Sequence, residues 1–269
     1  MAERSVFVSR DIFPFCEEIN VQFEYFQGFA LCQKRKSQIS IHENFKAAYP
    51  EEKVLEVSSS SLYSLGAKLS AMELKKKTKN GTTCVESAFQ SSRVYESNNE
   101  IIGPFINLLF LPGRECKKKV RALSEGFRFS HYNFEGLEFW PPSHHPSLFY
   151  DFLYINALTE PENRDVAEQL ISSGYTAFTD LATKSANTQA RSCAIFLSLV
   201  RNGLITYATN QESFLRLFDQ TSYENIHLTS SIPVVPCKIS RAEVEKIYTA
   251  NCQKLTNSKS ADNFLDLNL

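Results

Sequence analysis

Alternation of apolar and polar residues marks the first part of the chain as rich in β-strands. The segments 5–8 (SVFV) and 19–33 (INVQFEYFQGFALCQ) carry β-branched and aromatic residues at partly alternating positions, which predicts strands with Gly28 in a turn or bulge. The segment 37–50 (SQISIHENFKAAYP) changes to a helical spacing and ends on a proline, so we expect a helix there. The next apolar run, 53–58 (KVLEVS), is short and predicts another strand.

The second half of the chain is dominated by helical patterns. Segments 147–158 (SLFYDFLYINAL) and 164–174 (RDVAEQLISSG) predict two helices, the second closed by its terminal glycine. A third predicted helix spans 186–202 and is apolar on most of its faces, so we expect it at the centre of the core. Before these helices, residues 97–142 are rich in glycine and proline, which indicates irregular structure with short strands.

These elements together predict an α+β fold, mainly helical, formed by a single domain around a small antiparallel sheet. We assign residues 1–255 to this domain, because no linker or internal repeat divides them. Residues 256–269 are polar and then weakly apolar, so we expect a flexible C-terminal tail. The chain has 269 residues, 43% of them hydrophobic, which is enough for a core that holds a ligand cleft.

Charge and motif content exclude several classes of function. A formal net charge of −1 gives no global signature of nucleic-acid binding, so contacts with DNA would have to come from local patches such as the lysine runs 75–77 and 117–119. Walker A, GxGxxG, HExxH and GxSxG motifs are absent from the sequence. The sequence therefore does not support nucleoside-triphosphate hydrolysis or classical serine-hydrolase chemistry.

The seven cysteines indicate the compartment. Their number is odd and no two are spaced as CxxC, a pattern typical of reduced thiols in a cytoplasmic protein. Tightly spaced metal ligands are absent, as is a run of about 18 apolar residues that would cross a membrane. We therefore predict a cytoplasmic protein that acts without a membrane, a metal or another cofactor.

The segment 83–96 (TCVESAFQSSRVYE) is the first candidate for chemistry. It places Glu86, Gln90 and Arg93 at i, i+4 and i+7, on one face of a predicted helix. A carboxylate, an amide and a guanidinium in a row suit a polar pocket. Thr83 and Glu86 also fit a capping box, in which the glutamate binds the N-cap amide. The capping interpretation explains Glu86 but not the other two residues.

A second candidate is the segment 177–191 (AFTDLATKSANTQAR), in which an acid is followed by a loop of amide and basic side chains. Ser185 or Asn187 could instead be the N-cap of the buried helix, whereas Asp180 has no such structural explanation. A loop of this kind at the start of a buried helix is a plausible site. Its candidate residues are Asp180, Lys184, Asn187, Gln189 and Arg191.

The third candidate is the segment 65–74 (LGAKLSAMEL). Lys68 lies between Gly66 and Ser70 among small residues, so its ammonium group could approach a ligand closely. A solvent-exposed lysine is the commoner arrangement, since lysine is rarely buried without a partner.

Taken together, these motifs resemble the NADAR (NAD- and ADP-ribose-associated, YbiA-like) family. Glu86, Gln90 and Arg93 fall on the glutamate, the glutamine and the basic position of its helix motif, and Asp180 falls on the aspartate of its C-terminal motif. Arg93 stands where a lysine is usual. The match is closer to the branch found beside DarT-type DNA ADP-ribosyltransferase toxins, whose motifs occur here in order over about residues 20–205: FEYFQGF, CQKRKS, LGAKLSA, VESAFQSSRVY and FYDFLYINAL.

The resemblance implies an N-glycosidase that removes ADP-ribose from guanine in DNA and acts as the antitoxin to such a toxin. ADP-ribosylated DNA would be the substrate, ADP-ribose the product, and a DarT-type toxin encoded nearby a further partner. On this basis we assign Glu86 as the catalytic carboxylate and Asp180 as a ribose-orienting or second catalytic acid. Lys68 would act electrostatically or covalently at the anomeric carbon. The predicted substrate-binding residues are Ser70, Gln90, Arg93, Lys184, Asn187, Gln189 and Arg191.

Two other functions remain open at this point. The chain could be an N-glycosidase of riboflavin-pathway intermediates, which would ignore modified DNA. It could also be a non-catalytic reader of ADP-ribose, or an antitoxin that works by binding its toxin. In each case we expect the cleft between the helix of Glu86 and the loop that follows Asp180.

Overall fold

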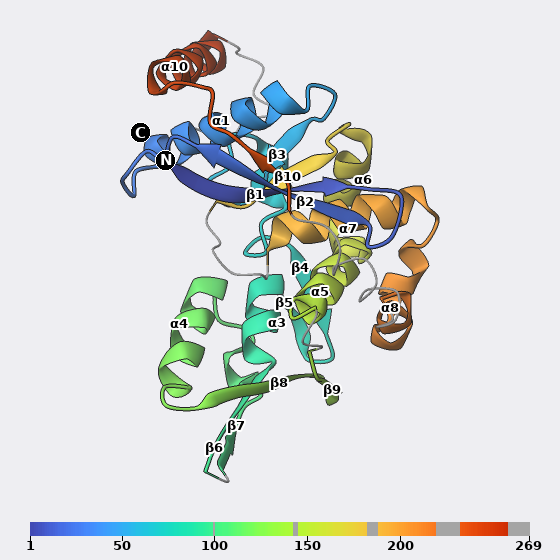
Figure 1. Ribbon diagram of the computed structural model, residues 1–269. Coiled ribbons are helices and arrows are strands. Elements are labelled where there is room, and N and C mark those ends of the chain that lie inside the picture. Colours follow the sequence, from blue (N-terminus) through green and yellow to red (C-terminus); the bar gives the residue numbers. More distant parts are fainter. Residues whose placement is uncertain (99, 142–144, 182–187, 219–231, 258–269) are drawn as a thin grey trace.

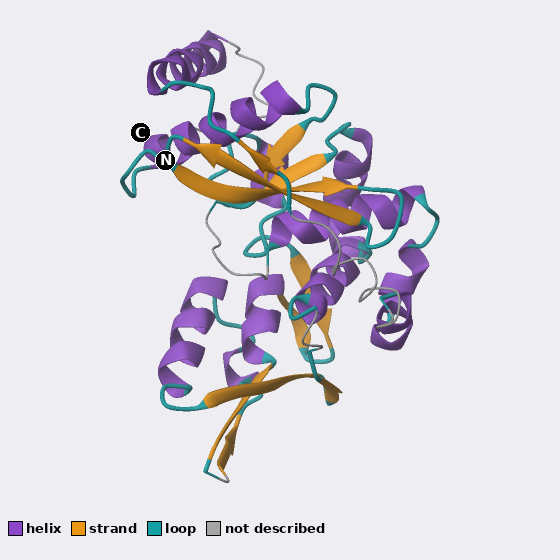
Figure 2. Cartoon of the chain, in the orientation of Figure 1, coloured by secondary structure: helices purple, strands orange, loops and turns teal. Residues whose placement is uncertain are grey.

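The computed structural model describes residues 1–98, 100–141, 145–181, 188–218 and 232–257. It combines helices and sheets, which confirms the predicted α+β class (Figure 1, Figure 2). The α-helices are α1 (Leu31–Ala48), α2 (Ser64–Lys68), α3 (Val85–Ser91), α4 (Gly113–Leu123), α5 (Leu148–Leu158), α6 (Arg164–Ser172), α7 (Gln189–Arg201), α8 (Gln211–Leu217) and α10 (Arg241–Asn257). The strands are β1 (Ala2–Ser9), β2 (Cys16–Phe23), β3 (Val54–Glu56), β4 (Lys75–Thr78), β5 (Gly81–Cys84), β6 (Arg93–Ser97), β7 (Glu100–Ile102), β8 (Arg128–Phe134), β9 (Leu137–Phe139), β10 (Ala177–Thr179) and β11 (Val234–Val235).

The main sheet has five strands in the order β11-β2-β1-β10-β3. Strand β1 pairs antiparallel with β2 and β10, whereas β3 runs parallel to β10 and β11 runs parallel to β2. The sheet is thus mixed rather than antiparallel as the sequence suggested. Parallel neighbours need a long crossover, and the chain from β3 to β10 supplies one that includes five helices, α2 to α6.

Helices cover both faces of the main sheet (Figure 1). Val6 and Val8 of β1 pack in one hydrophobic cluster with Ile41 and Phe45 of α1. Phe7, between them, points to the opposite face and belongs to the cluster built around α5 and α7. Alternating side chains of β1 therefore pack into two different hydrophobic clusters. Helix α7 is buried along most of its length, as its apolar faces predicted.

A smaller region contains the hairpin β4–β5 and a four-stranded sheet in the order β7-β6-β8-β9. Helices α3 and α4 lie side by side in this region (Figure 1). Helix α3 also packs against α5, which in turn packs against α7 beneath the main sheet. Through these contacts α5 joins the smaller region to the main sheet.

Most predicted elements are confirmed, including β1, β3, α5, α6 and α7. Residues 31–33 were expected in a strand but begin α1. The larger error is α4, which lies in the stretch predicted to be irregular and carries the lysine run 117–119. Its buried residues, Gly113, Cys116 and Val120, lie at i, i+3 and i+7, so the helical period is present in the sequence, but the apolar stripe is narrow and the rest of the segment is polar.

The C-terminal part of the described chain is helical. Helix α10 continues to Asn257, so it extends beyond residue 255, where we placed the end of the domain. Residues 258–269, which make up most of the expected tail, lie outside the described residues. None of the helices in the described ranges is long and apolar enough to span a membrane.

Gly66 of α2 provides a test of how tightly the segment 65–74 packs. A Cβ atom at Gly66 would lie 2.1 Å from the carbonyl oxygen of Glu56 and 2.4 Å from Ser61 Oγ. We expect Gly66→Ala to lower the free energy of unfolding by about 3 kcal/mol or more. Gly126→Ala is the control, because nothing lies within 4 Å there and a φ of +86° costs only about 1 kcal/mol. Chemical denaturation of both variants measures the difference, and equal losses would contradict the packing.

Candidate active site

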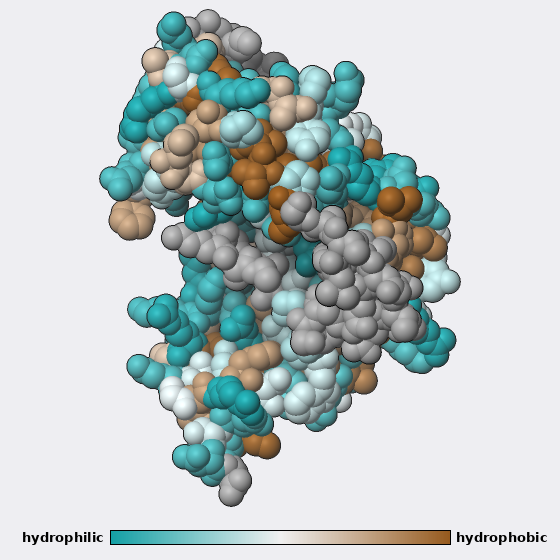
Figure 3. Space-filling model, viewed as in Figure 1, coloured by the Kyte–Doolittle hydropathy of each residue, from teal (hydrophilic) through white to brown (hydrophobic). Residues whose placement is uncertain are grey.

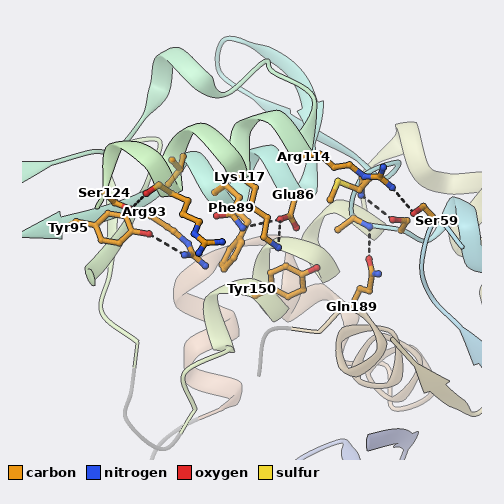
Figure 4. A pocket seen from close by; sticks show the side chains of 16 residues that line it. Ser59, Glu86, Phe89, Arg93, Tyr95, Arg114, Lys117, Ser124, Tyr150 and Gln189 are labelled. Carbon is orange, nitrogen blue, oxygen red and sulfur yellow. Dashed lines mark hydrogen bonds and ion pairs between the residues drawn. The ribbon is translucent and has the colours of Figure 1, made fainter. Parts of the chain in front are cut away.

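A cavity of about 420 Å³ lies where α3, α4 and the start of β6 face the segment 70–72. Tyr150 of α5 and Gln189 of α7 complete its wall, and Figure 4 shows these side chains from close by. In the space-filling view the surface is hollowed between the main-sheet region and the region of α3 and α4 (Figure 3). The cavity thus draws its residues from both regions, which is typical of a ligand site.

Glu86 lies in the first turn of α3, with its side chain in the cavity wall. The residue is only 7% exposed. Gln90, one turn further along α3, donates a hydrogen bond from Nε2 to Glu86 Oε1 at 3.0 Å. Lys117 Nζ of α4 lies 3.5 Å from the same oxygen. The carboxylate is therefore largely desolvated, oriented by an amide and balanced by an ammonium group.

The start of α3 differs from the predicted capping box. Cys84 is the N-cap, and its Sγ accepts a hydrogen bond from the backbone N–H of Ser87 at 3.4 Å. Thr83 belongs to β5 and donates its hydroxyl to the carbonyl oxygen of Leu109 at 2.6 Å. The cap therefore does not use the Glu86 carboxylate, which faces the cavity instead.

Helix α4 approaches Glu86 closely at Gly113. A Cβ atom at this position would lie 3.0 Å from Glu86 Cβ, 3.1 Å from Glu86 Cγ and 2.6 Å from Met72 Sδ. A larger residue would have to displace the Glu86 side chain. The absence of a side chain at Gly113 therefore lets the first turn of α4 form one wall of the cavity.

Helix α4 supplies a row of cations to this wall. Arg114, Lys117 and Arg121 are at i, i+3 and i+7, so they share the face of the helix that lines the cavity. Lys117 was predicted only as part of a lysine run that could contact DNA, and Arg114 and Arg121 were not predicted, because the helix that aligns the three cations was not recognised. An anionic ligand in the cavity would meet this row along its length.

Arg93 begins strand β6, because α3 ends at Ser91, so the prediction that Arg93 lies on the helix is wrong. It lines the cavity nevertheless. Its Nη1 donates to the Tyr95 hydroxyl at 3.2 Å, and its guanidinium lies 5.0 Å from the centre of the Phe89 ring. Its buried Nε has no hydrogen-bond partner in the described part of the chain. This N–H can therefore donate to a ligand.

Gln189 is the first residue of α7, and both the oxygen and the nitrogen of its side-chain amide form hydrogen bonds with backbone groups. Its Oε1 accepts from the N–H of Ala71 at 2.7 Å, and its Nε2 donates to the carbonyl oxygen of Val57 at 2.5 Å. The Ala71 carbonyl in turn accepts from the N–H of Glu86 at 2.9 Å. Gln189 lines the cavity, but its polar atoms fix the position of the Glu86 helix relative to α7.

Tyr150 of α5 is a cavity residue that the sequence analysis did not single out. Its ring packs edge-on against Phe89, and no described residue forms a hydrogen bond with its hydroxyl. Burial, and then the negative charges of Glu86 and Asp180, raise the pKa of Tyr150 well above its ordinary value. The phenol therefore stays protonated and can donate a hydrogen bond into the cavity.

The model of the DarT1-associated NADAR antitoxin family matches residues 2–228. The chain belongs to this NADAR antitoxin family. The family resemblance of the sequence motifs is thereby confirmed. No curated protein matches the chain.

Half of the predicted NADAR site residues line the cavity: Ser70, Glu86, Gln90, Arg93 and Gln189. Lys68 does not, because it is exposed and lines a different groove between α2 and α6. Lys184 and Asn187 lie outside the described residues. The expected cleft lay between the helix of Glu86 and the loop that follows Asp180. The cavity is bounded by α3 and reaches Gln189 at the start of α7, so it agrees with that expectation at these two places.

Asp180 follows β10 directly and is buried, but it is not among the residues that line the cavity. Thr188, the N-cap of α7, donates its hydroxyl toward Asp180 Oδ2 at 3.5 Å. The charge of Asp180 contributes to the raised pKa of Tyr150. In this NADAR chain the charge of Asp180 therefore reaches a cavity residue, Tyr150, although Asp180 does not line the cavity.

Glu56, at the end of β3, binds the residues on both sides of Asp180. Its Oε2 accepts from the Thr179 hydroxyl at 2.6 Å, and its Oε1 accepts from the N–H of Leu181 at 3.1 Å and from Ser58 Oγ at 2.8 Å. Burial, and then the charge of Asp180, raise the pKa of Glu56 to about 8 in spite of these bonds. Glu56 is therefore mostly protonated at neutral pH.

Arg191 contacts polar groups of the core, and its predicted contact with the substrate stays a prediction. Its Nη1 donates to Ser147 Oγ at 2.7 Å, its Nη2 lies 2.6 Å from His145 Nε2, and its Nε lies 3.7 Å from Asp151 Oδ2. Burial would raise the pKa of Asp151, but Arg191 and then His145 hold it below its usual range. Arg191 thus balances a buried carboxylate of α5, and it is not among the cavity residues.

Metal ligands do not cluster in the described ranges. No group of three or more histidine, cysteine, aspartate or glutamate side chains there is placed to hold an ion. The groups that can act on a ligand in the cavity are a carboxylate, two phenols, serine hydroxyls, amides and cations. This set suits acid–base chemistry on an anionic substrate.

Replacement of Gln189 tests the connection between α7 and α3. Gln189→Met leaves the Ala71 N–H and the Val57 carbonyl without partners, so we expect the free energy of unfolding to fall by about 2–4 kcal/mol. The control is Gln169→Met on the exposed side of α6, with an expected change within about 0.5 kcal/mol. Urea denaturation measures both, and equal stability of the two variants would contradict the assigned role.

Glu56 makes the stability depend on pH. Between about pH 4.3, where the unfolded carboxyl titrates, and about pH 8, the folded protein holds a proton that the unfolded chain has lost. This contribution lowers the free energy of unfolding as the pH rises through that window, and it is constant above it. Glu56→Gln removes the titration, so we expect the variant to gain a few kcal/mol relative to the native protein between pH 5 and pH 8. A parallel stability profile for both proteins would exclude the assignment.

Proposed function

We propose that this chain hydrolyses the N-glycosidic bond between ADP-ribose and a guanine base in DNA, and that it thereby acts in the cytoplasm as the antitoxin to a DarT-type toxin. The family match supports the antitoxin role. The observation that carries the proposed chemistry is the buried Glu86 carboxylate, held by Gln90 in a cavity that Arg93 and the cations of α4 also line.

The reaction needs a carboxylate at the sugar. When the bond between the anomeric carbon and the guanine nitrogen breaks, positive charge develops on the ribose, and a nearby carboxylate stabilises it. Glu86 also takes a proton from the attacking water, whose oxygen forms the new bond to the anomeric carbon. The electron pair of the broken bond remains on the guanine nitrogen, which gains a proton. The products are free ADP-ribose and unmodified guanine.

The remaining cavity residues suit the rest of ADP-ribose. The diphosphate is an anion, and Arg93, Arg114, Lys117 and Arg121 provide cations around the cavity. Arg93 offers an unused N–H as well. The protonated Tyr150 hydroxyl can donate to a ribose oxygen or to the leaving nitrogen. Lys68 is not needed in this scheme, and Asp180 acts through its effect on Tyr150.

Glu86→Gln tests the proposal on guanine-ADP-ribosylated single-stranded DNA, with released ADP-ribose as the readout. We expect the variant to lose roughly 10²- to 10⁴-fold in turnover, because glutamine cannot accept the proton or carry the charge. Binding of ADP-ribose should persist, since glutamine keeps the shape of the side chain. Glu115→Gln is the control, as Glu115 is an exposed residue of α4 paired with Lys119.

Other outcomes would decide among the alternatives. Equal turnover by both variants would show that the chemistry lies away from Glu86. Release from a free nucleotide but not from DNA would establish a small-molecule N-glycosidase. Stoichiometric protection against the toxin without release of ADP-ribose, unaffected by Glu86→Gln, would establish a non-catalytic antitoxin.

A further inference from the structure

A second groove of about 660 Å³ opens directly beside the cavity. The two depressions share Ser59, Met72 and Arg114, so a ligand can pass from one to the other without leaving the surface. The β4–β5 hairpin forms one side of this groove, and the segment 110–114 forms the other. A substrate larger than ADP-ribose therefore has a defined direction in which to continue.

The groove presents an exposed aromatic ring on a fixed backbone. Phe110 is 54% exposed, although Leu109 before it and Leu111 after it pack into hydrophobic clusters. The carbonyl oxygens of these two leucines accept hydrogen bonds from the hydroxyls of Thr83 and Ser87, each at 2.6 Å. The backbone is thus anchored on both sides, which turns Phe110 outward. A single exposed apolar side chain is common on protein surfaces, but Phe110 lies in a groove beside the cavity, where a ligand can reach its ring.

The ring itself also has a fixed position. Its edge lies against Gly81 of the β4–β5 hairpin, where a Cβ atom would come within 3.4 Å of Phe110 Cε1. Gly81 has no side chain that could cover the ring. The exposed part of the ring is therefore available for stacking by a planar group, and nucleic-acid bases stack on such rings in proteins that bind single strands.

Charge distinguishes this groove from the neighbouring groove that contains Lys68. Here two cations, Lys75 and Arg114, face one carboxylate, Glu73. The groove that contains Lys68 also reaches Ser59, but its charged residues are two cations and three carboxylates: Lys68, Lys75, Glu73, Glu162 and Asp165. A phosphodiester backbone is attracted by the first set and repelled by the second. The Phe110 groove is therefore the favoured path for a polyanion.

We propose that the Phe110 groove binds the single-stranded DNA that flanks the modified guanine, with one base stacked on Phe110 and a phosphate near Lys75. This inference rests on the proposed function, because it takes the modified guanine to be at the cavity. A single strand fits the arrangement better than a duplex. A base within a duplex is already paired and stacked on its neighbours, whereas an unpaired base can stack on a protein ring. The groove thereby distinguishes DNA from a free nucleotide.

The test compares two substrates and one ligand: an ADP-ribosylated guanine within a single-stranded oligonucleotide, the same modified guanine as a mononucleotide, and the unmodified oligonucleotide. We expect Phe110→Ala to raise both the KM for the modified oligonucleotide and the Kd for the unmodified one on the order of tenfold. Its turnover of the modified mononucleotide should stay unchanged. Tyr207→Ala, at another exposed aromatic residue, should change none of these values.

A charge variant gives an independent readout. Lys75→Met should weaken binding of the unmodified oligonucleotide and reduce the slope of log Kd against log salt concentration by about 0.7. Lys46→Met, at an exposed lysine in the last turn of α1, should leave the slope as it is. Fluorescence anisotropy at several salt concentrations measures both variants.

The outcomes separate this inference from the proposed function. Unchanged oligonucleotide binding in Phe110→Ala, or an equal loss on the mononucleotide, would overturn the groove as the DNA site. Failure of the native protein to bind the oligonucleotide would overturn it as well. Failure of the native protein to release ADP-ribose from either substrate would overturn the proposed function, whereas weaker oligonucleotide binding by Phe110→Ala would still establish the groove.

Discussion

The hydrogen bonds around Ala71 fix the position of helix α3, in the smaller region, relative to the main sheet and helix α7. The Gln189 amide at the start of α7 binds the Ala71 N–H and the Val57 carbonyl, and the Ala71 carbonyl binds the N–H of Glu86. One buried peptide segment therefore connects the edge of the main sheet, the central helix and the helix of the candidate catalytic carboxylate. Buried amide groups of this kind are costly to leave unpaired, so the position of Glu86 is set by the core and not by the surface.

The cavity forms because α4 can pack closely against α3, whose position these hydrogen bonds fix. Gly113 allows the first turn of α4 to contact the Glu86 side chain, and the same helix then carries its cations along the cavity. The carboxylate of Glu86, a residue that is only 7% exposed, would be unfavourable if its neighbours were apolar. Here Gln90 orients it and Lys117 balances it, at distances that leave the second carboxylate oxygen to meet water or a sugar. Packing and electrostatics thus place a desolvated acid beside a row of cations.

The sequence was most informative where a local period carried the signal. Glu86 and Gln90 were predicted together because i and i+4 spacing puts them on one helix face, and the structure has them hydrogen bonded. Arg93 reached the same cavity by another route, because the chain leaves α3 after Ser91 and enters β6. Arg191 was assigned to substrate because the sequence does not reveal that a buried carboxylate, Asp151, faces it from another helix. Such tertiary pairings override any local pattern.

Helix α4 shows the same limit for the fold and the site together. Its buried residues, Gly113, Cys116 and Val120, keep the spacing of a helix, but they are small or few among many charged residues, so the segment was interpreted as a solvated loop. The net charge of −1 concealed them further, since an overall balance says nothing about the place of each charge. Once α4 is packed on α3, its cations concentrate at the cavity and at the groove beside it, while carboxylates gather in the neighbouring groove. A nearly neutral chain can therefore present a locally cationic surface to an anion, because local fields act over about 8–10 Å in physiological salt.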